Sequence, residues 1–498
     1  MNIVYVSSEV APFSKTGGLA DIAGALPPEI AALGHHVSVM TPYYRGTKKI
    51  EPKPKLIAEG AVSVGTESVP WSLYLSAASP SPSGATKGQL KIYFIGCDSY
   101  FDRDGLYGTP NGDYEDSCSR FVFFSRACLA AAKSLGQPVD IWHCHDWQTA
   151  IIPAYLKILL ASDPFYSASK TVFTIHNLAY QGLFWHWDWP LLNLPWQHFN
   201  WRELEFHGKM NLLKGALVHA DILTTVSPTY AQEIQTPDYG CGLDGILSGR
   251  KDELIGIING IDKTAWNPAK DNFLPAEYSA RNMDGKQLCK AALRRKFNLS
   301  DGASVVIGMI GRLFEQKGFD LVTQGIDELL RRDVQLVILG TGREEFHKML
   351  QRVQQTNPKR VAVAFAFDNS LAHLIEAGSD MFLMPSRYEP CGLNQLYSLA
   401  YGTPPIVHNV GGLADTINDT TPASVEAGTA TGFRFDEYTS QAMLECIDRA
   451  LQVYTKQPDV WRKIQLAGMS QNWSWRRSAE EYVGVYERVK AKPAEKKA

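Results

Sequence analysis

The chain has 498 residues, of which 45% are hydrophobic and 20% are charged, and its formal net charge is −3. This length predicts two domains, and the composition is ordinary for a soluble enzyme. The small net charge does not indicate binding to nucleic acid or to an anionic membrane. No apolar run is long enough to span a bilayer, and no signal peptide is visible. We therefore expect a cytoplasmic protein.

The N-terminal half contains short apolar runs that predict strands and a segment that predicts a helix. One segment with helical periodicity covers residues 119–136. The runs with the length and residue content of strands are 3–9, 36–42, 90–96, 139–145, 171–177 and 222–227.

The alternation is more regular in the C-terminal half. Strand-like runs cover 304–311, 334–342, 360–367, 381–386 and 404–409. Helix-like segments cover 319–332, 344–355, 370–378 and 393–402. Apolar strands separated by helices imply a parallel sheet covered on both faces, so the predicted fold class is α/β with two Rossmann-like, doubly wound domains.

The domain boundary follows from a change in composition. Residues 263–285 are polar and broken by proline and glycine. We predict an N-terminal Rossmann-like domain over 1–260, a C-terminal one over 261–475, and a C-terminal helix with a basic tail over 476–498. Since open parallel sheets bind ligands outside the carboxyl ends of their strands, we expect the active site in a cleft between the two domains.

A glycine-rich turn follows the first predicted strand. The stretch "KTGGLAD" places Lys15, Gly17 and Gly18 at the start of a helix, where backbone amides carry partial positive charge and glycines let an anion approach. We interpret it as part of a phosphate site, and the alternative is an ordinary turn with a solvent-facing lysine. The letters "GGLAD" return at 411–415 without a cation, where we expect them to shape a wall of the site.

The C-terminal half supplies two more cations and a carboxylate. Arg312 and Lys317 flank a loop between a strand and a helix, and with Lys15 they suit a pyrophosphate; two lone surface cations are the alternative. Glu389 lies in a Pro/Gly loop after a predicted strand, where a carboxylate can stabilise positive charge on a sugar carbon. Cys391 in that loop is interpreted as a packing residue because no base accompanies it.

The polar residues do not favour a metal site. His143, His145, Asp146 and His176 end two N-terminal strands but lack the spacing of metallohydrolase motifs. The acidic residues in 102–104 are interpreted as part of a loop. The eight cysteines contain no C-x-x-C pair, which argues against zinc and a disulfide frame and favours a reducing compartment.

One segment is rich in tryptophan. Aromatic rings stack on sugar faces, but aromatic packing inside a large loop is at least an equal alternative. The tryptophans of this segment are Trp185, Trp187, Trp189, Trp196 and Trp201.

Together these motifs resemble the bacterial glycogen synthase and plant starch synthase family over nearly the whole chain. The matching motifs, in order, are "KTGGLAD", "HCHDW", "HNLAYQG", "NGID", "GRLFEQKG", "EPCGLNQLY" and "GGLADT". The resemblance implies a glycosyltransferase of the two-Rossmann-domain (GT-B) type that adds glucose from ADP-glucose to the non-reducing end of an α-1,4-glucan, with retention of configuration and without a metal or other cofactor. It also allows a plastid location for a mature chain.

The resemblance assigns roles residue by residue. The residues that it implies at the reacting sugar are Glu389, Asp146, His176 and Asp21. The residues that it implies at the donor are Lys15, Gly17, Gly18, Asn259, Arg312, Lys317, Phe367, Cys391 and Gly392. Phe367 would stack on the base, at a position where some relatives carry tyrosine.

The sequence leaves the mechanism and the substrates partly open. Tyr397 stands eight residues after Glu389, where many retaining enzymes outside the family carry a second acid, so we prefer a front-face reaction in which the departing phosphate helps to deprotonate the acceptor. Asn394 replaces a threonine of many bacterial members, as in soluble plant starch synthases, and leaves a glycogen or a starch-like product open. The alternatives are a UDP-sugar donor, a metal-dependent phosphohydrolase and a silent glucan-binding protein.

Overall fold

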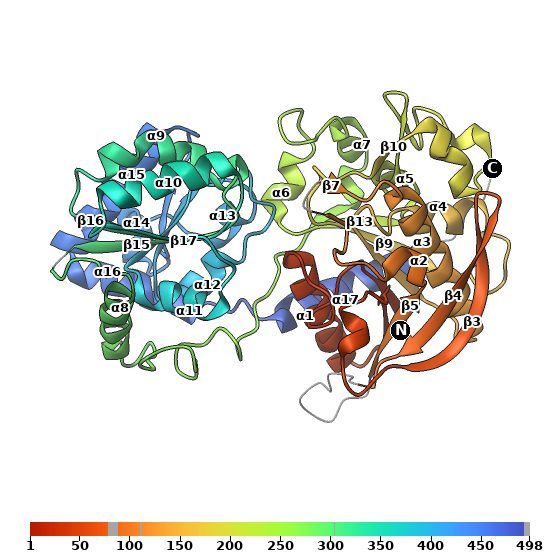
Figure 1. Ribbon diagram of the computed structural model, residues 1–498, viewed down its shortest axis with the longest axis horizontal. Helices are drawn as coiled ribbons and strands as arrows, with labels where there is room; N and C mark the ends of the chain where they lie inside the picture. The colour runs from red at the N-terminus through yellow and green to blue at the C-terminus, as the bar shows by residue number, and fades with distance from the viewer. Residues whose placement is uncertain (78–87, 110–111, 303, 493–498) are drawn as a thin grey trace. The chain divides into compact units, whose positions relative to one another are not determined.

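The computed structural model describes residues 1–77, 88–109, 112–302 and 304–492. It divides into two compact units. The first holds Met1–Val226, Ala231–Gly260 and Trp475–Ala498, and the second holds Ser227–Tyr230 and Ile261–Ser474. Each unit has a mainly parallel sheet with helices packed around it (Figure 1). The basic tail after residue 492 lies outside the described residues.

Within the described residues, the first unit contains a nine-stranded sheet with the order β14-β13-β9-β8-β1-β2-β5-β4-β3. The parallel strands are β1 (Asn2–Val6), β2 (His36–Pro42), β5 (Gln89–Gly96), β8 (Ile141–His145), β9 (Lys170–Ile175), β13 (Ile222–Thr225) and β14 (Leu254–Gly256). The antiparallel edge consists of β3 (Lys55–Val64) and β4 (Glu67–Leu75). A small antiparallel sheet consists of β10 (Leu183–Trp185), β12 (Lys209–Asn211) and β11 (Glu205–Phe206).

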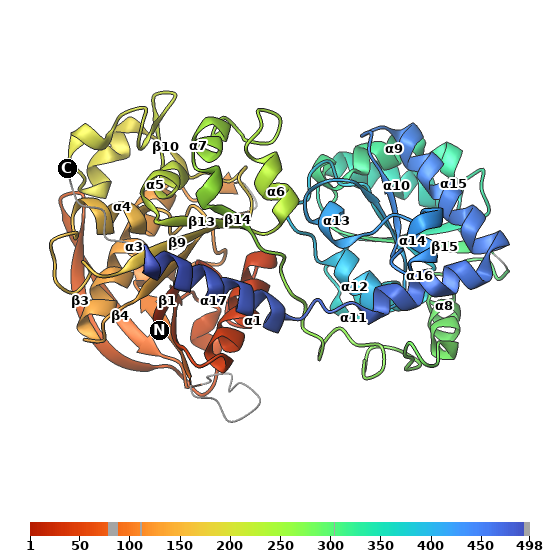
Figure 2. The same ribbon diagram turned by 180° about the vertical axis from the view of Figure 1, so that it is seen from behind.

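Two helices from opposite ends of the chain cover one face of the large sheet. Helices α1 (Gly18–Ala32) and α17 (Trp475–Ala491) lie side by side (Figure 2). Leu26 and Ile30 of α1 and Tyr486 of α17 are buried in one cluster with strand residues. Val4 and Val6, which point to the other face of β1, are buried as well, so both faces are covered. Other helices of this unit are α2 (Asp98–Phe101), α3 (Ser117–Ser134), α4 (Ile151–Ile158), α5 (Leu212–His219) and α7 (Asp244–Gly249), and α6 (Pro228–Glu233) is divided between the two units.

The second unit is built on a parallel sheet with the order β17-β16-β15-β18-β19-β20. Its strands are β15 (Val305–Ile310), β16 (Val334–Leu339), β17 (Val361–Ala364), β18 (Met381–Met384), β19 (Pro405–His408) and β20 (Phe433–Phe435). Numbered from β15, this order is 3-2-1-4-5-6, the order of dinucleotide-binding folds, and the direction of winding reverses between β15 and β18.

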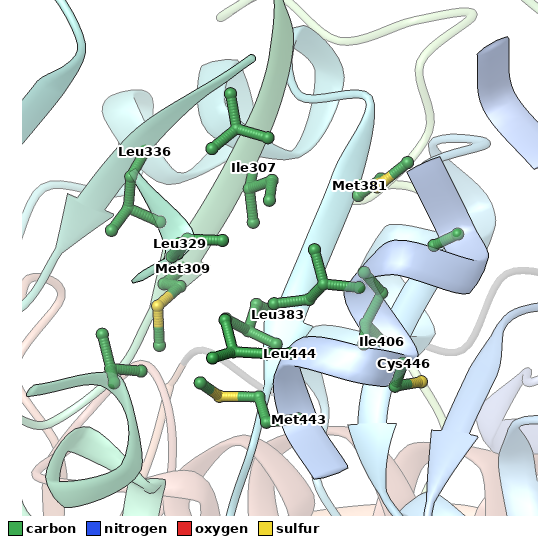
Figure 3. Packing of buried hydrophobic residues seen from close by; sticks show 14 of the residues in the cluster. Ile307, Met309, Leu329, Leu336, Met381, Leu383, Ile406, Met443, Leu444 and Cys446 are labelled. Atoms are coloured by element: carbon green, nitrogen blue, oxygen red, sulfur yellow. The ribbon is translucent and has the colours of Figure 1, made fainter. Parts of the chain in front are cut away.

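Helices cover both faces of this second sheet. On one face, Ile307 and Leu383 of the strands meet Met443 and Leu444 of α15 (Ser440–Lys456), as Figure 3 shows. On the other face, the alternate strand residues, such as Phe382, pack with further helices. The other helices are α8 (Asp284–Lys296), α9 (Phe319–Leu329), α10 (Glu344–Thr356), α11 (Asn369–Gly378), α12 (Asn394–Ala400), α13 (Gly411–Thr416), α14 (Pro422–Glu426) and α16 (Pro458–Ser470). No helix in the described ranges is long and apolar enough to cross a membrane.

The predicted α/β class with doubly wound sheets is confirmed, and α1 begins at Gly18 in the predicted turn. The hairpin of β3 and β4 was not predicted. Most residues of β3 are exposed, including the apolar Leu56 and Ile57, and its apolar residues do not form one continuous run. Its sequence therefore lacks the buried apolar run that identified the other strands.

Helix α17 joins the first unit through a buried polar contact as well as apolar packing. The Tyr486 hydroxyl lies 2.8 Å from Nδ1 of His143, and Nε2 of His143 lies 2.7 Å from the Thr174 hydroxyl. Tyr5 also packs against His143, with ring centroids 5.0 Å apart, but its buried hydroxyl has no hydrogen-bond partner in the described part of the chain.

We expect Tyr486→Phe to lower the free energy of unfolding by about 1–2 kcal/mol, because it leaves a buried nitrogen of His143 without a partner. The matched control is Tyr5→Phe, which removes a buried hydroxyl without a partner and should leave stability unchanged or raise it. Urea unfolding followed by circular dichroism measures both. Equal losses in the two variants would contradict the role given to the Tyr486 hydroxyl.

Candidate active site

The predicted site residues follow strands at the point where each sheet reverses its winding. In the first unit β1 lies between β8 and β2, so the loops after β1 and β8 leave the sheet at its switch point. They carry Lys15 and Asp146. In the second unit the loops after β15 and β18 do the same and carry Lys317 and Glu389. Ligands of open parallel sheets bind at this place.

Glu9, which belongs to none of the sequence motifs, organises the loop after β1. Glu9 is buried, and its carboxylate accepts hydrogen bonds from the backbone amides of Thr16 at 2.5 Å and Gly17 at 3.3 Å. It also accepts from the hydroxyls of Thr16 and Tyr107, both at 2.8 Å. A buried anion with this many donors fixes the loop. The available signal was one acidic residue at the end of a strand, which sequence alone cannot distinguish from a solvated one.

The start of α1 is open. A Cβ atom added at Gly17 or Gly18 would meet nothing within 4 Å in the described structure, so packing does not demand glycine there. Among the described residues, no side chain caps this helix end. The Nζ atom of Lys15 lies 2.6 Å from the Asp21 carboxylate, and both side chains are partly exposed. The arrangement presents a helix N-terminus and a cation that an anionic ligand could share with Asp21.

Asp146 follows β8 in a left-handed conformation, with φ of 54°. The turn directs its carboxylate to the backbone amide of His176, which donates to it at 2.8 Å. Burial raises the pKa of Asp146 to about 7 and the charge of Glu9 adds to the rise, while the amides of His176 and Asn177 oppose it. Asp146 therefore changes charge near neutral pH.

The neighbouring histidines are neutral. Nδ1 of His145 lies 2.9 Å from Nε2 of His176, and burial lowers the pKa of His176 to about 3. Burial also holds the pKa values of His143 and His145 well below the ordinary value. Both ring nitrogens of His143 are engaged by hydroxyls, so this residue has no free nitrogen for a metal. No group of three potential ligands suited to a metal ion exists among the described side chains.

In the second unit, Lys317 holds Glu389. Its Nζ atom lies 2.5 Å from a Glu389 oxygen that also accepts from the Ser386 hydroxyl at 3.0 Å. Glu389 is 5% exposed. Lys317 ends the short 3-10 helix η5 (Glu315–Lys317), and the next residue, Gly318, has φ of 76° and would place a Cβ 2.0 Å from the Pro385 carbonyl oxygen. Only glycine fits there, and it lets the two loops meet.

Arg312 and Phe367 are exposed in the same unit. The guanidinium of Arg312 lies 5.7 Å from the ring centroid of Phe314 and forms no ion pair with a described residue. Phe367 is 88% exposed. Both side chains are accessible to a ligand, as the predicted donor contacts require.

The second "GGLAD" supports the Glu389 loop. The Gly412 amide donates to the Glu389 carbonyl at 3.0 Å, and a Cβ on Gly412 would lie 2.0 Å from the Cys391 carbonyl oxygen. Cys391 is buried, and Gly392 has a left-handed backbone with φ of 73°. This copy shapes a loop, whereas the first copy leaves its backbone open.

Other residues that the sequence singled out do not belong to the ion pairs described above. Asn259 is buried after β14, and its amide oxygen has no partner in the part of the chain that the structure describes. Tyr397 stacks on Trp266 with centroids 3.7 Å apart, so the position of a second acid is filled by a packed aromatic ring. Asp102 and Asp104 pair with Arg45, each at 2.6 Å, which agrees with a surface loop.

Two family models match the chain. The model for the starch synthase catalytic domain matches residues 2–249, and the model for glycosyl transferases group 1 matches residues 291–464. The first match contains the site residues of the first unit other than Asn259, and the second match contains those of the second unit. Asn259 lies between the two matched ranges.

Curated proteins and solved structures are similar over the full length. A glycogen synthase of Koribacter versatilis is 49% identical over 490 residues and covers 98% of each chain. One of Anaeromyxobacter sp. is 47% identical over 493 residues, 99% of this chain and 100% of the relative. The catalytic domain of starch synthase IV from Arabidopsis thaliana, bound to ADP and acarbose, has a TM-score of 0.86 at 31% identity over 99% of each chain. Sucrose-phosphate synthase from Thermosynechococcus elongatus, at 17% identity and a TM-score of 0.58 over 98% of each chain, shows the fold alone.

We expect Asp146→Asn to gain stability relative to the wild type as the pH rises from about 4 to about 7. An unfolded aspartate has a pKa of about 3.9, so between the two values the folded protein binds more protons and loses stability with rising pH. The buried histidines, whose pKa values are lowered, make stability rise with pH, but the wild type and the variant share this contribution. Urea midpoints across this range measure the difference.

The control for this prediction is Asp163→Asn. A hydrogen bond from Lys133 lowers the pKa of Asp163, so its ionised form is the one stabilised by folding. This control should lose stability relative to the wild type as the carboxylate ionises. Parallel curves for wild type and Asp146→Asn would contradict the raised pKa.

Proposed function

The chain belongs to the glycogen synthase and starch synthase family of glucan-synthesising glycosyltransferases, and on that premise we propose how its residues transfer glucose from ADP-glucose to the non-reducing end of an α-1,4-glucan. The observation that carries the proposal is the Lys317–Glu389 pair at the switch point of the second sheet. It combines a phosphate-binding cation with a buried carboxylate, the two charges that a sugar diphosphate donor requires.

We assign the donor phosphates to three cations and a helix N-terminus. Arg312 and Lys317 follow β15, and Lys15 stands beside the open start of α1 with the backbone of Gly17 and Gly18. Helix amides and cations neutralise a diphosphate without a further cofactor. The exposed ring of Phe367 is assigned to the nucleotide base, and the loop residues Cys391 and Gly392 and the buried Asn259 to the transferred sugar and its phosphate.

We assign the chemical step to a front-face displacement. The bond between the anomeric carbon and the phosphate oxygen breaks, the acceptor hydroxyl oxygen bonds to that carbon on the same face, and its proton passes to the departing phosphate. Glu389 stabilises the positive charge that develops on the sugar. The stacked Tyr397 leaves no second carboxylate at the expected position, which disfavours a covalent double displacement.

Asp146, His176 and Asp21 complete the proposed site. Asp146 and the neutral His176 are linked through the backbone and can exchange hydrogen bonds with sugar hydroxyls. Asp21 holds the Lys15 cation until the donor binds. We also propose a cytoplasmic location, because all eight cysteines are unpaired, as a reducing compartment requires.

A transfer assay tests the proposal. Labelled ADP-glucose and UDP-glucose are each offered with glycogen as the acceptor, with and without EDTA. We expect label to enter glycogen from ADP-glucose at an unchanged rate in EDTA, with UDP-glucose the poorer donor. Preference for UDP-glucose would correct the donor, and loss of transfer in EDTA that manganese restores would reject the cofactor-free reaction.

We expect Glu389→Gln to lower turnover by about two to four orders of magnitude, the scale of losing an electrostatic stabiliser at a developing charge. The matched control is Glu376→Gln. Glu376 is fully buried on α11, and burial raises its pKa to about 8, so glutamine resembles its neutral form. Steady-state rates with ADP-glucose, and circular dichroism to verify folding, measure both. Near wild-type turnover in folded Glu389→Gln would remove this carboxylate from the mechanism.

A further inference from the structure

A pair of exposed tryptophans lies on the first unit. Trp185 ends β10, and Trp187 lies in the 3-10 helix η2 (His186–Leu192) that follows. Their rings are stacked, with centroids 5.2 Å apart and planes at 17°, and they are 52% and 64% exposed. Trp189, which also lies in η2, is buried, so β10 and η2 together direct one tryptophan into the protein and leave Trp185 and Trp187 exposed. We call Trp185 and Trp187 the tryptophan platform.

The platform is held in place before any ligand binds. Trp187 rests against Trp185 and meets the edge of the His186 ring, with centroids 4.5 Å apart. The Lys209 ammonium lies 4.7 Å from the Trp185 ring centroid, and Lys209 of β12 is the strand partner of Trp185. Rings fixed in this way lose little freedom on binding, which favours a preformed site. Lys209 and His186 place hydrogen-bonding groups beside the apolar rings.

This chemistry fits a sugar chain better than an apolar protein surface. A glucose ring presents a face of C–H groups that can lie on an aromatic ring, and a rim of hydroxyls that need donors and acceptors. The platform offers both kinds of surface within a few residues. A pair of tryptophan rings is small beside the area that a stable protein interface buries.

The platform is anchored to the candidate active site. Phe184, the residue before Trp185, packs on Trp147 with ring centroids 5.6 Å apart, and Trp147 directly follows Asp146. His176 precedes Trp185 by nine residues in the chain. Nine residues span at most about 30 Å even when fully extended, so a polymer with its end at His176 can reach the platform.

We propose that the tryptophan platform is a binding site for the body of the α-1,4-glucan acceptor, apart from the reacting end. This inference rests on the proposed function. A site of this kind raises the local concentration of the polymer at the reacting centre without taking part in the chemistry. It acts on long acceptors and leaves short ones unaffected.

The test is the double variant Trp185→Ala/Trp187→Ala, compared with Trp201→Ala. Trp201 is 71% exposed, and its ring lies near the Arg202 guanidinium, at 5.1 Å. We expect the double variant to raise KM for glycogen by about tenfold and to reduce its retardation in glycogen-containing native gels. The kcat, and KM for maltotriose, should stay at the wild-type values, and Trp201→Ala should match the wild type in every measurement.

Several outcomes overturn the inference. They are an unchanged KM for glycogen, an equal rise in KM for maltotriose, an equal effect of Trp201→Ala, and a change in sedimentation that would make the platform an interface between copies of the chain. Gel retardation by glycogen needs no donor. A wild-type protein that is retarded but does not transfer glucose would therefore refute the proposed reaction while leaving this site intact.

Discussion

The candidate site of the second unit depends on one ion pair, in which Lys317 on one loop holds Glu389 on another. The two loops leave adjacent strands, β15 and β18, and can meet only because Gly318 lets its backbone touch the Pro385 carbonyl. Asn394 adds a hydrogen bond at 2.7 Å to the Ile310 carbonyl at the end of β15. A buried carboxylate is stable only with such partners, so charge compensation and backbone geometry together determine where Glu389 stands.

The first unit also contains a buried carboxylate, but its hydrogen-bond partners differ. Glu9 is also a buried carboxylate near a switch point, but backbone amides and hydroxyls surround it in place of a cation. This leaves Lys15 at the surface, where it pairs with Asp21 and is accessible to a ligand. The Glu9 carboxylate therefore fixes the loop without engaging the cation that the loop carries.

Behind this loop, a row of neutral histidines connects the candidate site to the C-terminal helix. His176 contacts His145, whose ring lies 4.1 Å from that of His143, and His143 is held by Tyr486 of α17. The burial that keeps these rings neutral also raises the pKa of Asp146. Helix α17 thus supports residues that lie in or directly after β8 and β9.

The sequence by itself determined the α/β class, the start of a helix near Gly18, and membership in the family through motifs in fixed order. Apolar runs and glycine turns are local signals, so they can be read without a structure. The sequence also placed Lys317 and Glu389 at strand ends, but could not show that they form an ion pair. It missed the hairpin of β3 and β4, in which most of β3 is exposed and β4 buries only alternate residues.

Only the tertiary structure decided which partner each polar residue has. Glu9 accepts hydrogen bonds that fix the first loop, and Tyr397 stacks on another aromatic ring. His143 contacts the hydroxyl of a tyrosine 343 residues away. The shift in the pKa of Asp146 has the same origin. Burial and hydrogen bonding depend on every neighbour in space, and those neighbours come from distant parts of the chain, so no local pattern contains them.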